Sequence, residues 1–349
     1  MTNAYRWVQW NKHKRVYDAV IVGGVVAYIA GFVGISVATA PAPGEIMPPV
    51  LVMRALGTAA ALLLHVILAI GPASRIWPRL SPLLYNRRHL GVTCFIVAFL
   101  HAFIAIGFYG GFGVDNPLMA VLAGPGTRVP FELYGFGALC VLFVMAATSH
   151  DFWLANLGPR VWKTIHMLVY AAYLLLVAHL AFGALVSEKS PVYVVLLVAG
   201  IVGLVALHVV AGFRESARDA GGEPAGGWID LGTCEDIPEA RARVVCVKGS
   251  ERIAVYRDGE QLHAVSSVCA HQGGPLGEGK IVDGCITCPW HGYQYDAKNG
   301  QSPPPYTEKI ETYELRVEGG RVMLNPEPNA PGTPTDGTRI NTNAEGADV

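Results

Sequence analysis

The sequence is poor in charged residues, and the shortage is concentrated in one part of the chain. Asp, Glu, Lys and Arg make up 15% of its 349 residues, whereas about 25% is usual for a soluble globular protein. Residues 1–213 consist largely of long apolar runs, while residues 214–349 have ordinary polar content. The net charge of −1 gives no indication of a nucleic-acid partner. The imbalance predicts a membrane domain followed by a water-exposed domain.

Cysteines are sparse as well, and their distribution excludes a disulfide-rich secreted domain. The chain has seven cysteines, without the dense framework that such small domains need. Cys94 and Cys140 fall inside apolar runs, where a free cysteine behaves as a small core residue. We also expect no cleavable signal peptide, because the first apolar run is long and lacks a following cleavage site with polar sequence.

Six apolar segments reach or approach the length of about 20 residues that a helix needs to cross a bilayer core. Backbone polar groups in lipid must be satisfied within the segment, so the segments are predicted to be helices. They cover residues 18–40, 50–71, 89–112, 131–148, 162–186 and 191–212, and the fourth is the shortest. We therefore predict an all-α six-helix transmembrane bundle over residues 18–213, preceded by a cytoplasmic segment, residues 1–17.

Positive charges alternate between the loops of the predicted bundle. Most Lys and Arg residues lie in the N-terminal segment, the second and fourth loops and the exit from the sixth helix. The intervening loops carry only Arg128 and Lys189. The positive-inside rule places the positively charged segments in the cytoplasm. We expect a multi-pass protein of the cell (inner) membrane, in contact with lipid, with both termini cytoplasmic.

Seven of the eleven histidines lie in or beside the apolar half, where ionisable side chains are functional candidates. Imidazole is a common axial ligand of haem iron. The third and fifth predicted helices run in the same direction, and His101 and His179 lie 13 and 16 residues beyond Arg88 and Lys163. At 1.5 Å per residue these depths differ by about 5 Å. This outer pair is expected to hold one haem.

A second pair, His89 and His166, lies near the cytoplasmic ends of the same two helices. These residues are candidates for a second haem, about 18–20 Å from the first. Steps of 12 or 13 residues leave side chains about 120–140° apart on an ideal helix, so the inner pair is less well matched. His65 and His208 lack such a partner and are expected to pack or hydrogen-bond between helices. The prediction is one or two haems.

Two stretches of the apolar half resemble the ferric-reductase-like transmembrane domain. The first is residues 87–91 (RRHLG) with the helix that ends in residues 100–101 (LH). The second is residues 157–166 (LGPRVWKTIH), with His179 thirteen residues later. The family includes NADPH oxidases, ferric reductases and the haem-binding membrane subunit of the bacterial methionine sulfoxide reductase system. The resemblance covers about residues 50–213.

This resemblance implies a six-helix b-type haem protein that passes electrons outward from the cytoplasmic side. It implies haem ligation by His101, His166 and His179, and less directly by His89. Relatives in the family receive electrons from a flavin domain or a flavin reductase. This chain departs from that pattern, because a different kind of domain follows the bundle.

The second half of the chain is predicted to be a small all-β domain, residues 228–325, joined by a flexible linker, residues 214–227. Short β-type runs are separated by Gly, Asp and Pro turns. They cover residues 243–247, 252–256, 263–265, 280–282, 311–317 and 321–324. His263 is expected on the surface. Residues 326–349 are rich in Pro, Gly, Thr and Asn and are predicted to be a disordered tail.

Within this half, Cys269-x-His271 and Cys288-x-x-His291 form a highly specific pair of motifs, separated by sixteen residues. In a Rieske centre, two cysteines hold one iron of a [2Fe–2S] cluster and two histidines hold the other. We therefore predict one Rieske cluster on these four residues. The surrounding residues are similar to those of Rieske ferredoxins and of the Rieske domains of oxygenases.

The motifs depart from the respiratory Rieske type at two points. In the respiratory type, two further cysteines brace the cluster loops with a disulfide, and the corresponding residues of this chain look like Gly274 and Trp290. The serine that donates to a cluster sulfide in the respiratory type corresponds to Tyr293. Fewer hydrogen bonds to the sulfurs lower the reduction potential, which predicts a low-potential, ferredoxin-like cluster. A structural zinc site is disfavoured, because zinc ribbons usually pair like ligands. Cys285 then becomes an ordinary residue at a strand end.

The leading interpretation is a membrane-bound electron-transfer oxidoreductase. A cytoplasmic reductase or ferredoxin reduces the cluster, and electrons pass to intramembrane haem b and to an unidentified acceptor across the membrane. Two alternatives remain open: a quinol- or quinone-linked Rieske–cytochrome b type protein, and a membrane-anchored Rieske redox sensor without haem. A Rieske oxygenase is disfavoured, because no histidine follows His291 and its two-His, one-carboxylate iron site has no place. No catalytic residue is assigned.

Overall fold

The computed structural model describes residues 12–40, 47–110, 116, 119, 131–150, 153, 157, 159–187, 191–220, 227–271, 273–289, 292–304, 306–335 and 337–340. The chain divides into two compact units. One is helical and comprises residues 8–72 and 86–208. The other comprises the described residues of 209–340, which include the β domain, together with residues 73–85.

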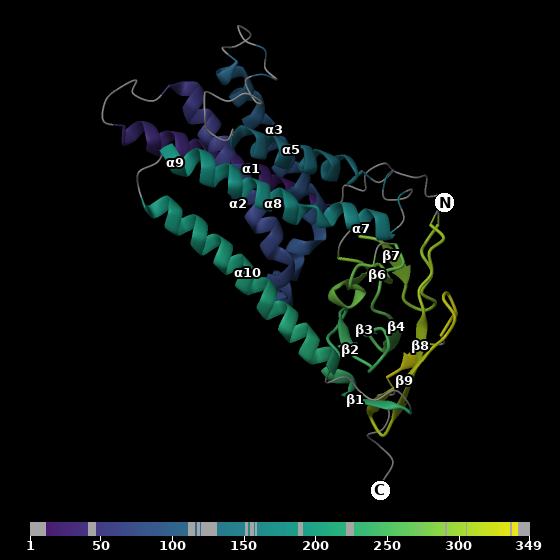
Figure 1. Ribbon diagram of the computed structural model, residues 1–349. Helices are drawn as coiled ribbons and strands as arrows, with labels where there is room; N and C mark the ends of the chain where they lie inside the picture. Colours follow the sequence, from purple (N-terminus) through teal and green to yellow (C-terminus); the bar gives the residue numbers. More distant parts are fainter. Residues whose placement is uncertain are drawn as a thin grey trace. The chain divides into compact units, whose positions relative to one another are not determined.

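Six helical segments occur in the described part of the N-terminal half, as predicted (Figure 1). The fifth segment is composite, because α7, α8, the π-helical turn η2 and α9 follow one another. A 3-10 helix, η1 (Pro78–Asn86), links the second segment to the third. The helices are α1 (Lys12–Ala38), α2 (Pro48–Ile76), α3 (Arg87–Tyr109), α5 (Phe131–Ala147), α7 (Pro159–Met167), α8 (Val169–His179), η2 (Leu180–Ala184), α9 (Leu185–Ser187) and α10 (Pro191–Ala220).

Five of these segments are long and apolar enough to cross a membrane. The other, α5, is apolar but has 17 residues. This agrees with the prediction that the fourth segment is the shortest. The predicted architecture, a helical transmembrane bundle followed by a β domain, is confirmed.

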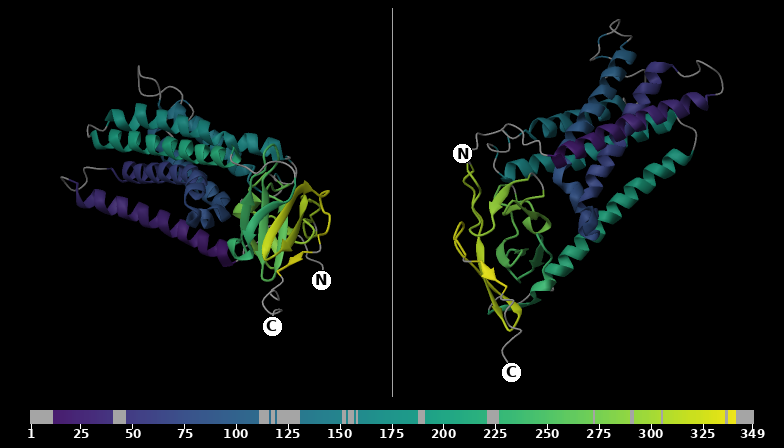
Figure 2. Two further views of the ribbon diagram at one scale, coloured as in Figure 1. Left: turned by 90° about the horizontal axis from the view of Figure 1, so that it is seen from below. Right: turned by 180° about the vertical axis from the view of Figure 1, so that it is seen from behind.

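Close contacts between helices rest on small residues. Ala59 and Ala60 of α2 pack with Val97 of α3 in one buried cluster, because small side chains let two helix backbones approach closely. Tyr28 of α1 packs against the same cluster and donates a hydrogen bond of 2.9 Å to Thr58 of α2. α5 lies alongside α8, which Figure 1 and the two further views of Figure 2 show. These packed helices bring together side chains that are far apart in the sequence.

In the described residues of the second half, seven strands form one antiparallel sheet and three strands form another. The first sheet has the order β1-β9-β8-β4-β3-β2, with β10 also paired to β4, and the second has the order β5-β6-β7. The strands are β1 (Ile229–Thr233), β2 (Ala242–Val245), β3 (Ile253–Asp258), β4 (Gln261–Ser266), β5 (Lys280–Val282), β6 (Cys285–Thr287), β7 (Gln294–Asp296), β8 (Thr312–Glu318), β9 (Arg321–Pro328) and β10 (Thr338–Arg339).

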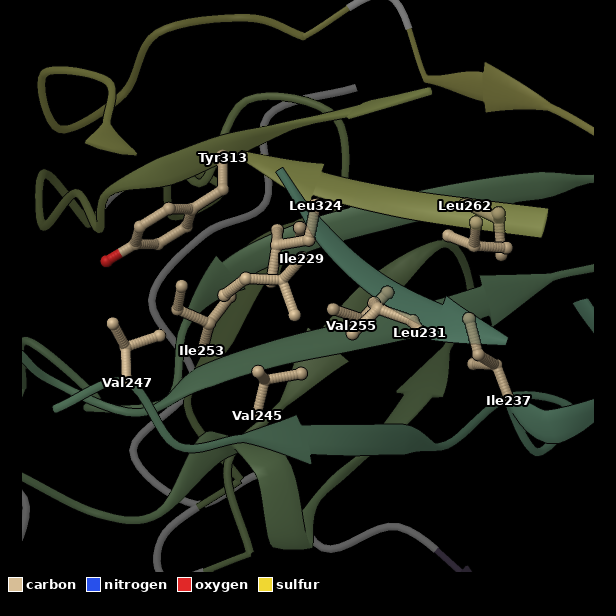
Figure 3. Packing of buried hydrophobic residues seen from close by; sticks show 12 residues of the cluster. Ile229, Leu231, Ile237, Val245, Val247, Ile253, Val255, Leu262, Tyr313 and Leu324 are labelled. Atoms are coloured by element: carbon tan, nitrogen blue, oxygen red, sulfur yellow. The ribbon is translucent and has the colours of Figure 1, made fainter. Parts of the chain in front are cut away.

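Strand β3 contributes to two separate buried clusters. Alternate side chains of a strand point to opposite faces. Ile253 and Val255 belong to the first cluster, which Figure 3 shows with residues of β1, β2 and β9. Ala254 and Tyr256 belong to the second cluster, which also contains Cys269 and Cys288. The sheet therefore separates an apolar core from the region that contains the candidate iron ligands.

The structure corrects the predicted boundaries of the linker and the tail. Helix α10 continues to Ala220, so residues 214–220 are helical rather than a flexible linker. This stretch contains no glycine or proline, and Glu215 and Arg218 form an ion pair of 3.2 Å one turn apart. At the other end, β9 continues to Pro328 and β10 pairs with β4. Residues 326–340 are thus largely part of the β domain, and residues 341–349 lie outside the described residues.

The expectation that His263 lies on the surface is wrong. Its side chain is 1% exposed, because the segment that leads into β10 covers it. A Cβ atom on Gly337 would lie 3.3 Å from Cε1 of His263. The tail that was predicted to be disordered therefore buries this histidine.

Candidate iron–sulfur and haem sites

The first motif lies in a tightly closed loop after β4. The backbone N–H of Cys269 donates to the carbonyl of Gly274 at 2.8 Å, and the N–H of Gly273 donates to the carbonyl of Cys269 at 2.7 Å. Gly273 has a φ of +69°, a left-handed conformation that glycine adopts without a steric penalty. His271 lies within this closed loop, two residues after the cysteine.

The second motif lies in a loop of the same form, between β6 and β7. The N–H of Cys288 donates to the carbonyl of Tyr293 at 2.7 Å, and the N–H of Gly292 donates to the carbonyl of Cys288 at 2.9 Å. Gly292 has a φ of +71°. The fourth predicted ligand, His291, and the adjacent Trp290 lie outside the described residues. Each loop thus folds around one cysteine with the same spacing of donors and acceptors.

The candidate cysteines are shielded from water. Cys269 is 2% exposed and Cys288 is 1% exposed, and both lie in the same buried cluster. The Nδ1 atom of His271 is also buried. Thiolates and imidazoles are the donors that hold the two irons of a Rieske cluster. The buried sulfurs and ring nitrogen fit that donor set, and Cys285, at the start of β6, stands at a strand end as expected.

Tyr295 contacts both residues of the first motif. Its hydroxyl oxygen lies 3.3 Å from Sγ of Cys269 and accepts the backbone N–H of His271 at 3.2 Å. Burial and the neighbouring Cys269 raise the pKa of Tyr295, so the phenol stays protonated. A cysteine that ligates iron is a thiolate, so Tyr295 would be the donor. Sequence reasoning missed this residue, although it is the buried middle residue of β7.

Tyr293 lies against His271 through its ring. The two ring centroids are 4.5 Å apart with an interplanar angle of 7°, and the hydroxyl of Tyr293 donates to Glu308. Burial and the hydrogen bond to Glu308 raise the pKa of Tyr293. The ring of Tyr293 also contacts the rings of Tyr306 and Tyr295, with centroids 4.9 Å and 5.4 Å away. At the position of the respiratory serine, this chain therefore has an aromatic side chain whose hydroxyl bonds a carboxylate.

The outer histidine pair converges in the helical bundle. The ring centroids of His101 and His179 are 6.1 Å apart, with an interplanar angle of 80°. Nδ1 of His101 donates to the carbonyl of Met53, and Nδ1 of His179 donates to the carbonyl of Phe131, each at 2.9 Å. Within the described residues, no hydrogen bond engages Nε2 of either ring. This arrangement fits axial ligation, in which a backbone carbonyl fixes the tautomer of a metal-binding histidine.

The inner histidine His89 is held by a carboxylate of α1. Its Nδ1 lies 2.9 Å from both oxygens of Asp18, and Asn86 donates to the same carboxylate at 2.8 Å. These partners are 71 and 68 residues apart in the sequence, so no local pattern predicts them. Asp18 is, however, the one acidic residue in α1, which is itself a signal that sequence reasoning did not use.

The other inner histidine, His166, has different surroundings. Its Nδ1 donates to the carbonyl of Trp162 on its own helix at 3.0 Å, and its Nε2 lies 3.3 Å from the hydroxyl of Ser149. The imidazole stacks on the Trp162 ring, with centroids 3.7 Å apart. The inner pair is thus held by unlike partners, whereas the outer pair is held by like partners.

His65 and His208 connect helices. Nε2 of His65 in α2 lies 2.9 Å from the hydroxyl of Tyr173 in α8. His208 in α10 donates from Nδ1 to the carbonyl of Leu204 at 2.9 Å, and its Nε2 lies 3.3 Å from the hydroxyl of Tyr170. Both histidines are hydrogen-bonded between helices, as expected.

The two cysteine loops and the apolar bundle together define a membrane-embedded redox protein with an iron–sulfur domain. The profile of the family described as "Rieske [2Fe-2S] domain" matches residues 227–314, and that of "Ferric reductase like transmembrane component" matches residues 55–177. The chain belongs to the Rieske [2Fe–2S] family through its C-terminal domain, which is fused to a ferric-reductase-like transmembrane domain.

Similar proteins match the C-terminal domain. The anthranilate 1,2-dioxygenase ferredoxin subunit of Burkholderia cepacia is 37% identical over 103 residues, which are 28% of this chain and 91% of that protein. The ferredoxin component of the naphthalene 1,2-dioxygenase/salicylate 5-hydroxylase systems of Ralstonia sp. is 35% identical over 29% of this chain and 96% of its own length.

A solved complex of reduced oxygenase and oxidized ferredoxin in carbazole 1,9a-dioxygenase contains a chain that is 28% identical to this one. The match covers 31% of this chain and 95% of that chain, with a TM-score of 0.27. The family matches and the apolar helices make this chain a multi-pass membrane protein of the electron-transfer type.

Proposed function

We propose that the protein conducts electrons from a cytoplasmic donor, through a Rieske [2Fe–2S] cluster, to haem b inside the membrane and on to an acceptor across the membrane. The observation that carries this proposal is the pair His101 and His179. Their rings meet inside the bundle, and each is oriented by a backbone carbonyl through Nδ1. The iron–sulfur cluster and the haem, when bound, would supply one-electron redox chemistry, and the chain supplies their position and environment.

In the β domain, Cys269 and Cys288 are proposed to hold one iron of the cluster, and His271 and His291 the other. Both cysteines are buried, so the surrounding protein excludes water from the iron that they are proposed to hold. Tyr295 provides a hydrogen bond to Cys269, which favours the reduced cluster by stabilising negative charge on sulfur. With no bracing disulfide expected between the loops, the cluster is proposed to be of the low-potential ferredoxin type.

In the bundle, His101 and His179 are the proposed axial ligands of the outer haem. A hydrogen bond from Nδ1 fixes the ring orientation and makes Nε2 a stronger ligand. His166 and His89 are proposed ligands of a second, inner haem. The bond from His89 to Asp18 is the type of second partner that metal-binding histidines have. The number of haems is one if the outer pair acts alone and two if the inner pair also binds.

The proposed donor is a cytoplasmic reductase or ferredoxin. Two relatives of the C-terminal domain are ferredoxin components of oxygenase systems, which supports an exchange of electrons with a protein partner. The positively charged loops support the placement of both termini on the cytoplasmic side of the inner membrane. The acceptor on the opposite face is proposed only as a class, an oxidant reached from the outer haem.

The test is to purify the full chain and to count haem and cluster by optical and EPR spectroscopy. We expect b-type bands and a Rieske EPR signal in the same preparation. His101→Ala and His179→Ala are expected to lose the outer haem, while His65→Ala and His208→Ala, the matched controls in the same bundle, retain it. Full haem content in His101→Ala and His179→Ala would refute the ligand assignment, and wild-type protein without haem would favour the redox-sensor interpretation.

A further inference from the structure

The two outer histidines are held by the same three-part arrangement, repeated on two pairs of helices. On α2 and α3, Met53 supplies the carbonyl, Gly57 follows four residues later, and His101 follows 48 residues after Met53. On α5 and α8, Phe131, Gly135 and His179 have identical spacings, four and 48 residues. Both glycines therefore occupy the same place relative to the carbonyl that accepts the Nδ1 hydrogen bond.

Each glycine leaves space that the imidazole occupies. A Cβ atom on Gly57 would lie 2.9 Å from both Nδ1 and Cε1 of His101, and one on Gly135 would lie 2.7 Å from Nδ1 of His179. Real Cβ atoms essentially never approach other atoms below 3.0 Å. An alanine at either position would therefore push the ring away from the helix or rotate it.

The reason for the spacing is helix geometry. The carbonyl of residue i in an α-helix points towards residue i+4, and the side chain of residue i+4 stands over the same face. An imidazole that donates to that carbonyl must lie against residue i+4. Glycine is otherwise among the least favourable residues inside a helix. The close approach of the imidazole ring explains why glycine occurs at these two positions.

We propose that Gly57 and Gly135 are positioning residues for the outer haem, which hold the two axial imidazoles against neighbouring helix backbones and so keep their planes nearly perpendicular. The inference rests on the proposed function of His101 and His179 as haem ligands. It goes further, because it assigns the angle between the ligand planes, 80° in the structure, to two residues that do not touch iron.

Two other glycines provide controls. Gly137 lies two residues after Gly135 on α5, but a Cβ atom there would lie 3.4 Å from Leu175, an ordinary contact. Gly200 of α10 is as tightly placed as Gly57, because a Cβ atom there would lie 2.9 Å from Nε2 of His65. His65 is bonded to Tyr173 and is not proposed to bind haem. Gly200→Ala thus reproduces the steric conflict without touching the proposed haem site.

The experiment compares the purified full chain with Gly57→Ala, Gly135→Ala, Gly137→Ala and Gly200→Ala. Haem is quantified relative to the Rieske cluster, whose EPR signal reports the amount of protein with a folded β domain, and ferric haem is examined by low-temperature EPR; Gly200→Ala controls for the effect of a tight glycine contact on the bundle itself. Wild-type protein is expected to give the highly anisotropic low-spin signal of nearly perpendicular imidazoles. Gly57→Ala and Gly135→Ala are expected to shift that signal and to retain haem about tenfold less tightly, whereas Gly137→Ala and Gly200→Ala keep both properties.

Two results would overturn the inference. One is an unchanged haem signal and content in both Gly57→Ala and Gly135→Ala. The other needs no variant: a wild-type outer-haem signal typical of parallel imidazole planes. Failure of the proposed function is a separate result, since it requires wild-type protein without haem or unaltered haem in His101→Ala and His179→Ala.

Discussion

The hydroxyl of Tyr295 lies 3.3 Å from the sulfur of Cys269, and this contact joins a strand of the small sheet to the loop of the first motif. The phenol also accepts the N–H of His271, so one side chain bonds to both members of the motif. A hydrogen bond to a sulfur ligand stabilises the extra negative charge of a reduced cluster, and it therefore raises the reduction potential.

Tyr295→Phe is expected to lower the potential of the Rieske cluster. The variant loses the hydrogen bond to sulfur but keeps the aromatic ring. If the hydrogen bond is about 1.4 kcal/mol stronger in the reduced cluster than in the oxidised one, the potential falls by about 60 mV. A redox titration followed by EPR measures the shift. Thr287→Val is the control. It removes a hydroxyl from the residue before Cys288, but that hydroxyl donates to the carbonyl of Cys285. An unchanged or higher potential in Tyr295→Phe would contradict this role.

Gly279→Ala is expected to damage the cluster loop through a backbone clash. A Cβ atom on Gly279 would lie 2.2 Å from the carbonyl oxygen of Thr287, the residue before Cys288. Backbone atoms cannot rotate away, so the β domain is expected to lose about 1–3 kcal/mol of stability, as in overpacked cores, together with part of its cluster. Iron content and denaturant unfolding measure both effects.

Gly249→Ala is the matched control for this variant. A Cβ atom there meets no atom within 4 Å, although the φ of +76° makes alanine unfavourable, at a cost of about 1–2 kcal/mol. This variant is expected to keep its full cluster content. Equal loss of iron in both variants would show that the contact with Thr287 has no special effect.

The β domain is expected to lose stability as the pH falls below about 6.5, the ordinary pKa of histidine. Burial lowers the pKa of His263, so in the unfolded chain this residue binds a proton at a higher pH than in the folded domain. Stability from the neutral ring is therefore complete above the unfolded pKa and is lost as the pH drops towards the folded pKa.

His263→Leu is expected to flatten this pH dependence. Denaturant unfolding at several pH values between about 7 and 5, followed by the Rieske EPR signal, gives the slope for wild-type and variant protein. The difference between the two slopes isolates His263 from all other titrating groups. Parallel curves would mean that His263 binds protons equally well in both states.

Asp18→Asn tests whether His89 binds an inner haem. The carboxylate accepts Nδ1–H of His89, which makes the other nitrogen a stronger ligand and favours ferric iron. The variant is expected to raise the midpoint potential of the inner haem and to weaken its binding by about tenfold. Optical redox titration resolves this haem from the outer one, whose potential serves as the internal control. If haem content and every potential stay at wild-type values, His89 is not a ligand.

Sequence patterns predicted the parts of this fold that depend on local composition. Apolar length located six helices, including the short α5. The spacing of Cys269, His271 and Cys288 located two loops whose geometry the structure then supplied. Strands β5, β6 and β7 have three residues each, too few to display an alternating pattern. Of these, β5 was predicted from the sequence, and β6 and β7 were not.

The rest depends on contacts between distant residues. The pairing of β10 with β4, which buries His263, joins segments more than 70 residues apart and left no local signal. The bond between Asp18 and His89 spans 71 residues. Depth along a helix matched His101 with His179, but the carbonyl and glycine partners of each ring became visible only when α2 and α5 were placed beside them.

Strand β3 faces one apolar cluster with Ile253 and Val255 and the other with Ala254 and Tyr256. Because a single strand contributes to both clusters, we expect the two sides of the domain to unfold together, with release of the iron–sulfur cluster in the same thermal transition. Loss of the Rieske EPR signal on heating is therefore expected to coincide with unfolding of the whole β domain.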